Sequence, residues 1–220
     1  CYRKGNYQQA IIDYNNLLKE GVSADVYYNL GNAYYRSDSL ANAILCYERA
    51  HLLSPGDKDI NFNLQFANSK TIDKITPANE VIFITWYKSL VNLTNVDTWA
   101  RLGIVSIVVA LVLVLIYLFA SRVAFRKIGF FGSIAFLALF LCSTLFATQQ
   151  KSALEHRNGA IIMAPSVSVK QSPVNNAPES FVIHEGTKVE ITDNGMKGWK
   201  GIKLGDGREG WIHSSGLELI

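Results

Sequence analysis

The hydrophobic and polar positions follow three different patterns along the chain. Residues 1–76 place apolar side chains at the three-to-four-residue spacing of amphipathic helices. Residues 102–148 contain two long uncharged runs, and residues 160–220 alternate apolar and polar positions between turn-forming residues. We therefore predict a multidomain membrane protein with an all-α region at residues 1–76, a two-helix transmembrane hairpin and a small all-β barrel at residues 160–220.

The two uncharged runs cover residues 102–121 and 128–148. As a helix the first run would be about 30 Å long, which is the thickness of the hydrocarbon core of a bilayer. A helical hairpin buried in a soluble domain is the alternative, and it fits a chain of this length poorly. The predicted loop between the runs, residues 122–127 (RVAFRK), carries three positive charges and no negative one. Short basic loops stay in the cytoplasm, so we expect both ends of the chain on the other side of the membrane.

The segments beside the two runs have less definite patterns. Trp86, Tyr87 and Trp99 lie in the segment 77–101, where an aromatic belt would meet the membrane surface. Residues 82–93 are either a helix lying along the interface or the last packed helix of the preceding region. Residues 149–159 are expected to be a linker.

The all-α region contains an internal repeat. Residues 5–18 align with residues 38–53, so that Ala10 matches Ala43 and Tyr14 matches Tyr47, each pair 33 residues apart. A period of this length indicates stacked helical hairpins. The later copy is complete and resembles the tetratricopeptide repeat, and the family's packing positions are occupied by Tyr27, Leu30, Gly31, Tyr34, Ala43, Tyr47, Ala50 and Pro55. The earlier copy keeps only its second helix.

The residue types at the packing positions have physical reasons. Gly31 and Ala43 are small where two antiparallel helices approach closely, and Tyr34 and Tyr47 fill the groove between the helices. Pro55 stops the second helix because it cannot donate a backbone hydrogen bond. After it, residues 56–70 predict a closing helix that is capped by Asp57 and buries Ile60, Leu64 and Ala67 on one face.

The first helix of such a repeat lines a concave groove that binds peptides or partner segments. Amide side chains hydrogen-bond the backbone of an extended peptide, and an arginine pairs with a carboxylate. The alternative is that these residues are common repeat sequence without a ligand. The candidate partner-binding residues are Tyr28, Asn29, Asn32, Tyr35 and Arg36.

The all-β region resembles the bacterial SH3-like domain along the whole of residues 160–220. Asp206 and Gly207 form a hairpin signal between two short apolar strands. The resemblance rests on Val169, Ser172, Pro173, Glu185, Gly186, Thr187, Val189, Gly198, Trp199, Asp206, Gly207, Gly210 and Trp211, whereas Lys170 and Gln171 stand where the family often has an arginine. Such domains often bind cell-wall peptides. Trp199 and Trp211 are the candidate ligand face, although in so small a barrel at least one of them is expected in the core.

Composition and charge narrow the function. The formal net charge of +3 is concentrated around the apolar runs, since residues 1–80 carry 8 basic and 9 acidic side chains and residues 157–220 carry 7 of each. Neither end is therefore a basic nucleic-acid-binding domain. The chain starts at Cys1, which indicates a fragment or a processed chain whose export signal has been lost; a lipidated Cys1 is the alternative.

Candidate chemistry is sparse. Cys1, Cys46 and Cys142 form no paired pattern, and the four histidines (His51, His156, His184 and His213) lie singly, so neither a disulfide framework nor a metal site is predicted. A Cys–His pair for nucleophilic catalysis is not apparent either. We expect no catalytic site and no cofactor.

The order of the parts resembles the BatE family, whose members are encoded in the Bacteroides aerotolerance operon. The resemblance implies a two-pass protein of the inner membrane with periplasmic N- and C-terminal domains. The family is encoded beside membrane proteins with von Willebrand-type domains and a MoxR-type ATPase. The resemblance therefore implies a role in a loosely defined assembly or stress-tolerance complex at the envelope, with the von Willebrand-type proteins as expected partners. We therefore expect a non-enzymatic scaffold that binds proteins through the repeats. The rival hypothesis is an envelope sensor whose SH3-like domain binds peptidoglycan.

Overall fold

The computed structural model describes residues 2, 5–76, 82–155 and 157–220, and the chain forms two compact units. The first unit combines residues 1–85 with residues 156–220, and the second is residues 86–155. Cys1 and the first five residues of the predicted segment 77–101 lie outside the described residues. The first unit therefore joins two stretches of sequence that the apolar helices separate.

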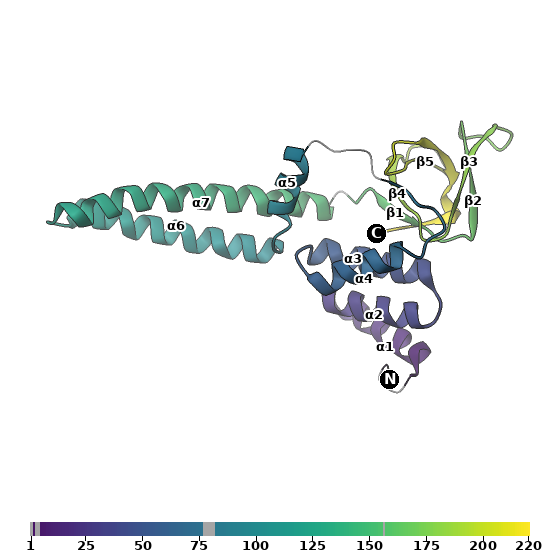
Figure 1. Ribbon diagram of the computed structural model, residues 1–220, viewed down its shortest axis with the longest axis horizontal. Coiled ribbons are helices and arrows are strands. Elements are labelled where there is room, and N and C mark those ends of the chain that lie inside the picture. Colours follow the sequence, from purple (N-terminus) through teal and green to yellow (C-terminus); the bar gives the residue numbers. More distant parts are fainter. Residues whose placement is uncertain (1, 3–4, 77–81, 156) are drawn as a thin grey trace. The chain divides into compact units, whose positions relative to one another are not determined.

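The helical part of the first unit consists of four consecutive helices (Figure 1): α1 (Tyr7–Glu20), α2 (Ala24–Arg36), α3 (Leu40–Leu53) and α4 (Lys58–Asn68). The side chain of Asn6 caps α1 by accepting a hydrogen bond from the backbone N–H of Gln9. As the sequence predicts, Asp57 caps α4 by accepting from the N–H groups of Asp59 and Ile60. The apolar face of α4 is also the predicted one, with Ile60, Leu64 and Ala67 buried.

The second part of this unit is an antiparallel sheet of seven strands. Its strands are β1 (Gly159–Ile162), β2 (Ser166–Lys170), β3 (Glu179–His184), β4 (Lys188–Asp193), β5 (Trp199–Lys203), β6 (Glu209–His213) and β7 (Leu217–Leu219). They pair in the order β3-β2-β6-β5-β4-β1-β7, which leaves β3 and β7 as edge strands. The sheet is therefore open, in contrast to the closed barrel expected from the sequence. Its core contains Ile162, Val169, Val189, Ile202 and Ile212.

The helices and the sheet share a hydrophobic core. Ile161 of β1 and Ile220 are buried in one cluster with Ala43, Ile44 and Tyr47 of α3. Side chains alternate between the two faces of a strand, so Ile161 faces α3 while its neighbours Ala160 and Ile162 lie in the core of the sheet. The all-α region and the all-β region are thus parts of one compact unit, a packing that the sequence analysis did not predict.

Polar contacts accompany this shared core. Lys188 Nζ lies 2.7 Å from Glu48 Oε2, and the Glu48 side chain is only 5% exposed. Asp73, which follows α4, accepts hydrogen bonds from the backbone N–H of His184 at 2.6 Å and from the Thr187 hydroxyl at 2.7 Å. His184 Nδ1 lies 2.9 Å from the other Asp73 oxygen. The sheet is therefore held on the helices by paired charged and polar groups as well as by apolar burial.

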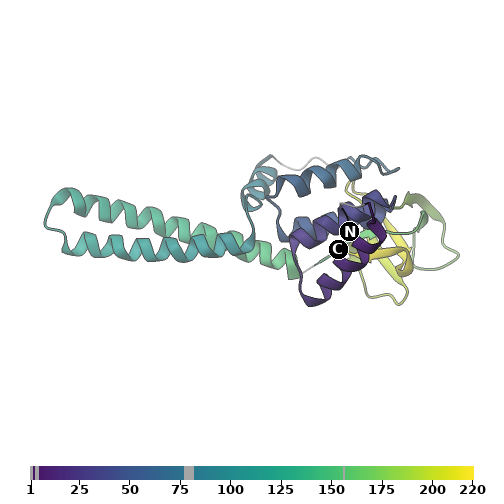
Figure 2. The ribbon, with the colours of Figure 1, turned by 90° about the horizontal axis from the view of Figure 1, so that it is seen from below.

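The second unit is dominated by two long helices, α6 (Val96–Phe119) and α7 (Val123–Glu155), which follow the short helix α5 (Ile82–Val91). Both views show α6 and α7 running side by side (Figure 1, Figure 2). α6 begins before the predicted run 102–121 and ends within it, at Phe119, whereas α7 extends beyond the predicted run 128–148 at both ends. Residues 123–127 belong to α7 instead of the predicted loop 122–127. The predicted linker 149–159 likewise starts as helix. Charge limited the predicted runs, but charged residues do not interrupt a helix.

Small residues lie where α6 and α7 touch. Gly103, Ser106 and Ala110 are the buried residues in the middle of α6, and Gly129 and Ser143 are buried on α7. A Cβ atom at Gly129 would lie 2.7 Å from the Leu113 carbonyl oxygen and 2.7 Å from the Tyr117 nitrogen, so the two backbones approach closely there. The large apolar side chains of both helices point outward instead.

Candidate functional site

One face of α2 meets one face of α4 at an aromatic and amide surface. Tyr28, Asn32 and Tyr35 recur on α2 at positions i, i+4 and i+7, so they lie on one side of the helix. We call their surroundings the α2–α4 surface. Its members are Tyr28, Asn32, Tyr35, Phe62, Asn63 and Phe66.

A hydrogen-bond network fixes the centre of the α2–α4 surface. The Asn32 side-chain oxygen accepts from the Tyr47 hydroxyl at 2.8 Å and from Asn63 Nδ2 at 2.8 Å. Asn63 Nδ2 also donates to the Tyr28 hydroxyl at 3.1 Å. Burial raises the pKa of Tyr47, which keeps its hydroxyl protonated and able to donate. Three helices are thus linked through one amide oxygen.

Exposed aromatic rings lie beside this network. The rings of Tyr35 and Phe66 are 5.7 Å apart, and Phe62 stacks on Phe66 at 6.4 Å with nearly parallel planes. Phe62 is 67% exposed and Phe66 is 44% exposed. Lys70 Nζ lies 5.0 Å from the centre of the Phe66 ring. The site therefore offers flat apolar rings with a positive charge at one edge.

The structure divides the five predicted partner-binding residues. Tyr28, Asn32 and Tyr35 belong to the α2–α4 surface. Asn29 is exposed, and its Nδ2 donates to the Asp25 carbonyl at 2.8 Å. Arg36 is exposed too, and a hydrogen bond with Tyr2 raises its pKa. Partner binding by any of the five stays a prediction, and the oxygen of Asn32 is already engaged within the protein.

The contribution of α4 to this surface was not predicted from the sequence. Ile60, Leu64 and Ala67 were predicted to form the packed face, and the next stripe of the helix had no predicted role. Phe62 and Phe66 are four residues apart, which places both on that stripe. Two phenylalanines at this spacing on a polar face were the available signal.

The packing positions of the repeat are occupied as follows. Leu30, Gly31, Ala43, Tyr47, Ala50 and Pro55 are buried, while Tyr27 and Tyr34 are partly buried. A Cβ atom at Gly31 would lie 2.6 Å from Cε1 of Tyr47, so a side chain at position 31 would collide with the ring. Arg49 of α3 lies over the Tyr27 ring at 5.9 Å.

Residues 24–57 match the tetratricopeptide repeat. The match covers α2 and α3 and ends at the Asp57 cap of α4. No curated protein matches the sequence. The chain therefore contains a tetratricopeptide repeat, and such repeats form concave surfaces on which other proteins bind. The α2–α4 surface combines the first helix of this repeat with the helix that follows the repeat.

The sheet carries a second aromatic surface. Trp199 pairs with His213 and Gly201 pairs with Trp211 across β5 and β6, so both tryptophans lie on the face opposite Ile202 and Ile212. Trp199 and Trp211 are partly buried, and neither belongs to the core of the sheet, where one of them was expected. The Trp199 ring lies 4.2 Å from the ring of His213. A Cβ atom at Gly201 would lie 3.0 Å from Cβ of Asp193 and 3.0 Å from Oγ1 of Thr192, so the end of β4 packs closely against Gly201.

Other chemistry is limited in the part of the chain that the structure describes. No group of three His, Cys, Asp or Glu side chains there is placed to hold a metal ion. Cys46 is buried, which raises the pKa of its thiol to about 12. At that pKa the group stays a neutral thiol at neutral pH and is a poor nucleophile.

Proposed function

We propose that this protein is a non-enzymatic, membrane-anchored scaffold that binds a protein partner on the α2–α4 surface. The observation that carries the proposal is the position of Phe62 and Phe66, which are exposed beside the first helix of a tetratricopeptide repeat. Aromatic residues, phenylalanine included, are enriched in protein interfaces relative to the rest of the protein surface. Lys70, beside the Phe66 ring, supplies a positive charge for an acidic side chain of the partner.

The outward-facing apolar side chains of α6 and α7 support the membrane anchor. In the most apolar stretch of each helix only 17% of α6 and 11% of α7 is buried, whereas the core helix of a soluble protein is mostly buried. Small residues lie between the helices and large apolar ones lie outside, as in helix pairs that are surrounded by lipid. Because the two helices form a hairpin, the sequences before and after it lie on one side of the membrane. This agrees with their packing into a single unit.

The short helix α5 supports placement at the membrane surface. Ile82 is 83% exposed, Phe83 79% and Trp86 65%, which is unusual for a helix that faces water. Apolar and aromatic residues at this density are typical of helices that lie in the interface. Of the two alternatives for residues 82–93, we favour the interfacial helix.

The finer assignment rests on the resemblance of the whole chain to the BatE family. We propose an inner-membrane protein with both terminal parts in the periplasm and an SH3-like sheet region. Its partners would be membrane proteins with von Willebrand-type domains within an aerotolerance complex. The order of repeat, apolar hairpin and small all-β region supports this assignment.

Cross-linking in native membranes tests the scaffold proposal. The full chain is cross-linked, purified in mild detergent, and its cross-linked peptides are identified by mass spectrometry. Cross-links from α2 and α4 to a membrane protein with a von Willebrand-type domain are expected. F62A/F66A should reduce them about tenfold or more, as loss of a central aromatic contact does. I12A removes an exposed apolar side chain from α1 and should leave them unchanged. Equal cross-linking by both variants would refute the α2–α4 surface as the binding site.

Cysteine labelling tests the topology. A single cysteine at Ser121, between α6 and α7, should resist a membrane-impermeant thiol reagent in intact spheroplasts. A cysteine at the exposed Ser166 of β2 should react. The parent for both variants should carry Cys1→Ser, Cys46→Ala and Cys142→Ser, so that the introduced cysteine is the single thiol of the chain. The reverse pattern would place the repeat and the sheet in the cytoplasm.

A second candidate function is peptidoglycan binding by the sheet. The shared face of Trp199 and Trp211 favours it, since tryptophan rings stack on flat or sugar-like ligands. The full chain in detergent should then sediment with purified cell-wall sacculi, and W199A/W211A should abolish this. The isolated sheet region is unsuitable for the test, because Ile161 and Ile220 would lose their cover on α3. No sedimentation by the parent protein would leave the scaffold as the better account.

A further inference from the structure

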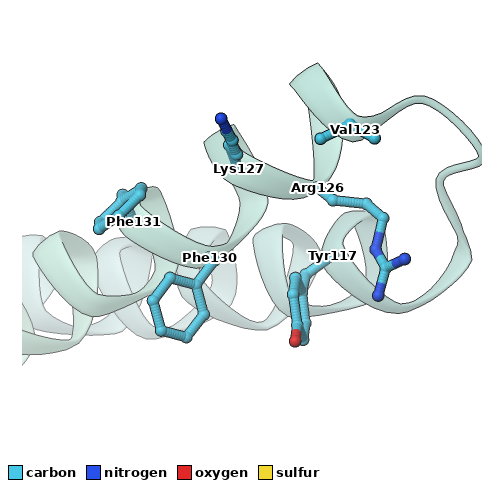
Figure 3. Close-up of a pocket in the computed structure, with 6 residues that line it drawn as sticks. All are labelled: Tyr117, Val123, Arg126, Lys127, Phe130 and Phe131. Carbon is cyan, nitrogen blue, oxygen red and sulfur yellow. The ribbon is translucent and has the colours of Figure 1, made fainter.

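The end of the α6–α7 hairpin carries a pocket of about 290 Å³. Its walls come mainly from the first turns of α7, together with one tyrosine of α6. The lining residues are Tyr117, Val123, Arg126, Lys127, Phe130 and Phe131. Figure 3 shows Tyr117 and Phe130 side by side, with Arg126 extending from α7 along the same side. The pocket thus has aromatic walls and a cationic side chain at one end.

The charge of this end is entirely positive. Residues 113–132 contain Arg122, Arg126 and Lys127 and no acidic residue. The Arg126 guanidinium lies 5.5 Å from the centre of the Tyr117 ring, which is within the range of a cation–π interaction. These features select an anion, and an arginine is especially suited to the oxygens of a phosphate group.

The apolar wall decides what kind of anion fits. Val123 and Phe131 are each 67% exposed, and Phe130 is 44% exposed, directly beside the cationic group. Free inorganic phosphate would gain nothing from these side chains. A ligand with an anionic head and long apolar chains would cover both surfaces. At about 290 Å³ the pocket takes a headgroup, while the chains would continue along the apolar outer face of α7.

The pocket is held in shape by the contact between the helices. Gly129 lets the backbone of α7 approach Leu113 and Tyr117 of α6. The rings of Tyr117 and Phe130 are consequently 5.6 Å apart, and Arg126 lies one turn before Phe130 on the same helix. The site is preorganised on two helices, which lowers the cost of ordering it when a ligand binds.

We propose that this pocket binds the headgroup of an acidic phospholipid, with the lipid phosphate at Arg126 and its acyl chains passing Phe131. Lys127 adds positive charge to the same headgroup region. The inference rests on the proposed membrane hairpin, because it requires Tyr117 and Arg126 to lie at headgroup level. Basic pockets at the ends of transmembrane helices bind acidic lipids by this chemistry.

Native mass spectrometry of the full chain tests the proposal. The protein, purified in mild detergent, is mixed with phosphatidylglycerol or with phosphatidylcholine that has identical acyl chains. Phosphatidylglycerol adducts should predominate, and R126Q should weaken them about tenfold, as removal of one charge-assisted hydrogen bond does. R122Q removes the same charge from the same end of the hairpin but does not line the pocket, so it should retain binding. K127Q provides a second pocket variant if R126Q does not purify as a folded protein.

The outcomes separate this proposal from the membrane anchor. Equal retention of the two lipids, or equal losses in R126Q and R122Q, would overturn the lipid site. Displacement of phosphatidylglycerol by millimolar inorganic phosphate would overturn it as well, since it would indicate a site for free anions. Resistance of the protein to alkaline extraction from membranes is measured in parallel. Extraction into the soluble fraction would refute the hairpin itself, whereas retention without lipid selectivity would refute only the lipid site.

Discussion

Asn32 stabilises the repeat through a single oxygen atom. N32A would leave the Tyr47 hydroxyl without a hydrogen-bond acceptor, and Asn63 Nδ2 would lose one of its two acceptors. Because an unsatisfied buried polar group costs about 1–3 kcal/mol, we expect the free energy of unfolding to fall by about 2 kcal/mol. The measurement is denaturant unfolding of the full chain, followed by circular dichroism.

N29A is the matched control for N32A, because Asn29 is exposed on the same helix. It should change the free energy of unfolding by less than about 0.5 kcal/mol, as most surface substitutions do. Equal stability of the two variants would contradict the structural role of Asn32. The role also makes N32A a poor probe of partner binding, since lost binding would reflect lost packing.

Asp73 makes the stability of the first unit depend on pH. Partial burial by itself would raise the pKa of its carboxyl group, but hydrogen bonds from Thr187 and His184 outweigh burial and lower the pKa below 3.8. A lowered pKa stabilises the fold above the unfolded-state value, and this stabilisation is lost as the pH falls through the folded-state value. The stability difference between the parent and D73N should therefore be larger at about pH 6 than at about pH 3.

Denaturant midpoints at the two pH values measure this difference. E185Q removes an exposed carboxylate next to His184 and should not reproduce the pH-dependent gap. If D73N and the parent lost stability in parallel from neutral to acidic pH, the Asp73 contacts would not contribute. The sequence could not indicate this role, because Asp73 and His184 are 111 residues apart and lie in different patterns.

At the scale of elements, the contact between α6 and α7 depends on individual glycines. A Cβ atom at Gly129 would meet backbone atoms of Leu113 and Tyr117, which cannot move aside. At Gly132 it would meet only the end of the Leu113 side chain, at 3.0 Å. We expect G129A to destabilise the hairpin by about 1–3 kcal/mol, the usual cost of overpacking, and G132A to cost much less.

Thermal unfolding in detergent checks this prediction through the loss of helical circular dichroism. A melting temperature that falls clearly for G129A and little for G132A is expected. Equal behaviour of the two variants would mean that α6 and α7 do not approach each other as closely as the structure has them.

Sequence patterns were informative about which elements form. Helical spacing and the residues Asp57 and Pro55 were enough to predict α3 and α4, because caps and stop signals are local. The first and last residues of α6 and α7 were predicted less accurately. Arg126 and Lys127 set the start of the predicted second run at residue 128, but α7 already begins at Val123, because charged residues such as arginine and lysine are compatible with a helix. The aromatic stripe of α4 was missed because only the packed stripe was considered.

At the scale of the whole molecule, β1 joins the hydrophobic cluster of the repeat helices to the core of the sheet. Ile161 is fully buried against α3, while its neighbours Ala160 and Ile162 are buried in the sheet. I161A should destabilise the first unit by about 2–5 kcal/mol, the range for large-to-small changes in a core. Because α3 and β1 share the cluster, hydrogen exchange should accelerate in peptides of both elements.

V182A is a suitable control, since Val182 lies on the edge strand β3 and is 41% exposed. It should leave exchange in α3 unchanged. Faster exchange in β1 alone after I161A would show that the helices and the sheet fold independently. This coupling between α3 and β1 is not visible in the sequence, because a strand with both faces buried is one continuous apolar run. Its two faces are told apart only once their partners are known.

The shared core also has a consequence in time. Glu48 and Lys188 are 140 residues apart, and the whole hairpin is synthesised between them. At ordinary rates of translation, the apolar side of α3 stays exposed for roughly 7–30 s until the strands that pack on it have been synthesised. During this interval the nascent helices expose apolar surface that chaperones and proteases recognise. The speed at which the second half of the chain is made and delivered would then govern how much of the first half survives.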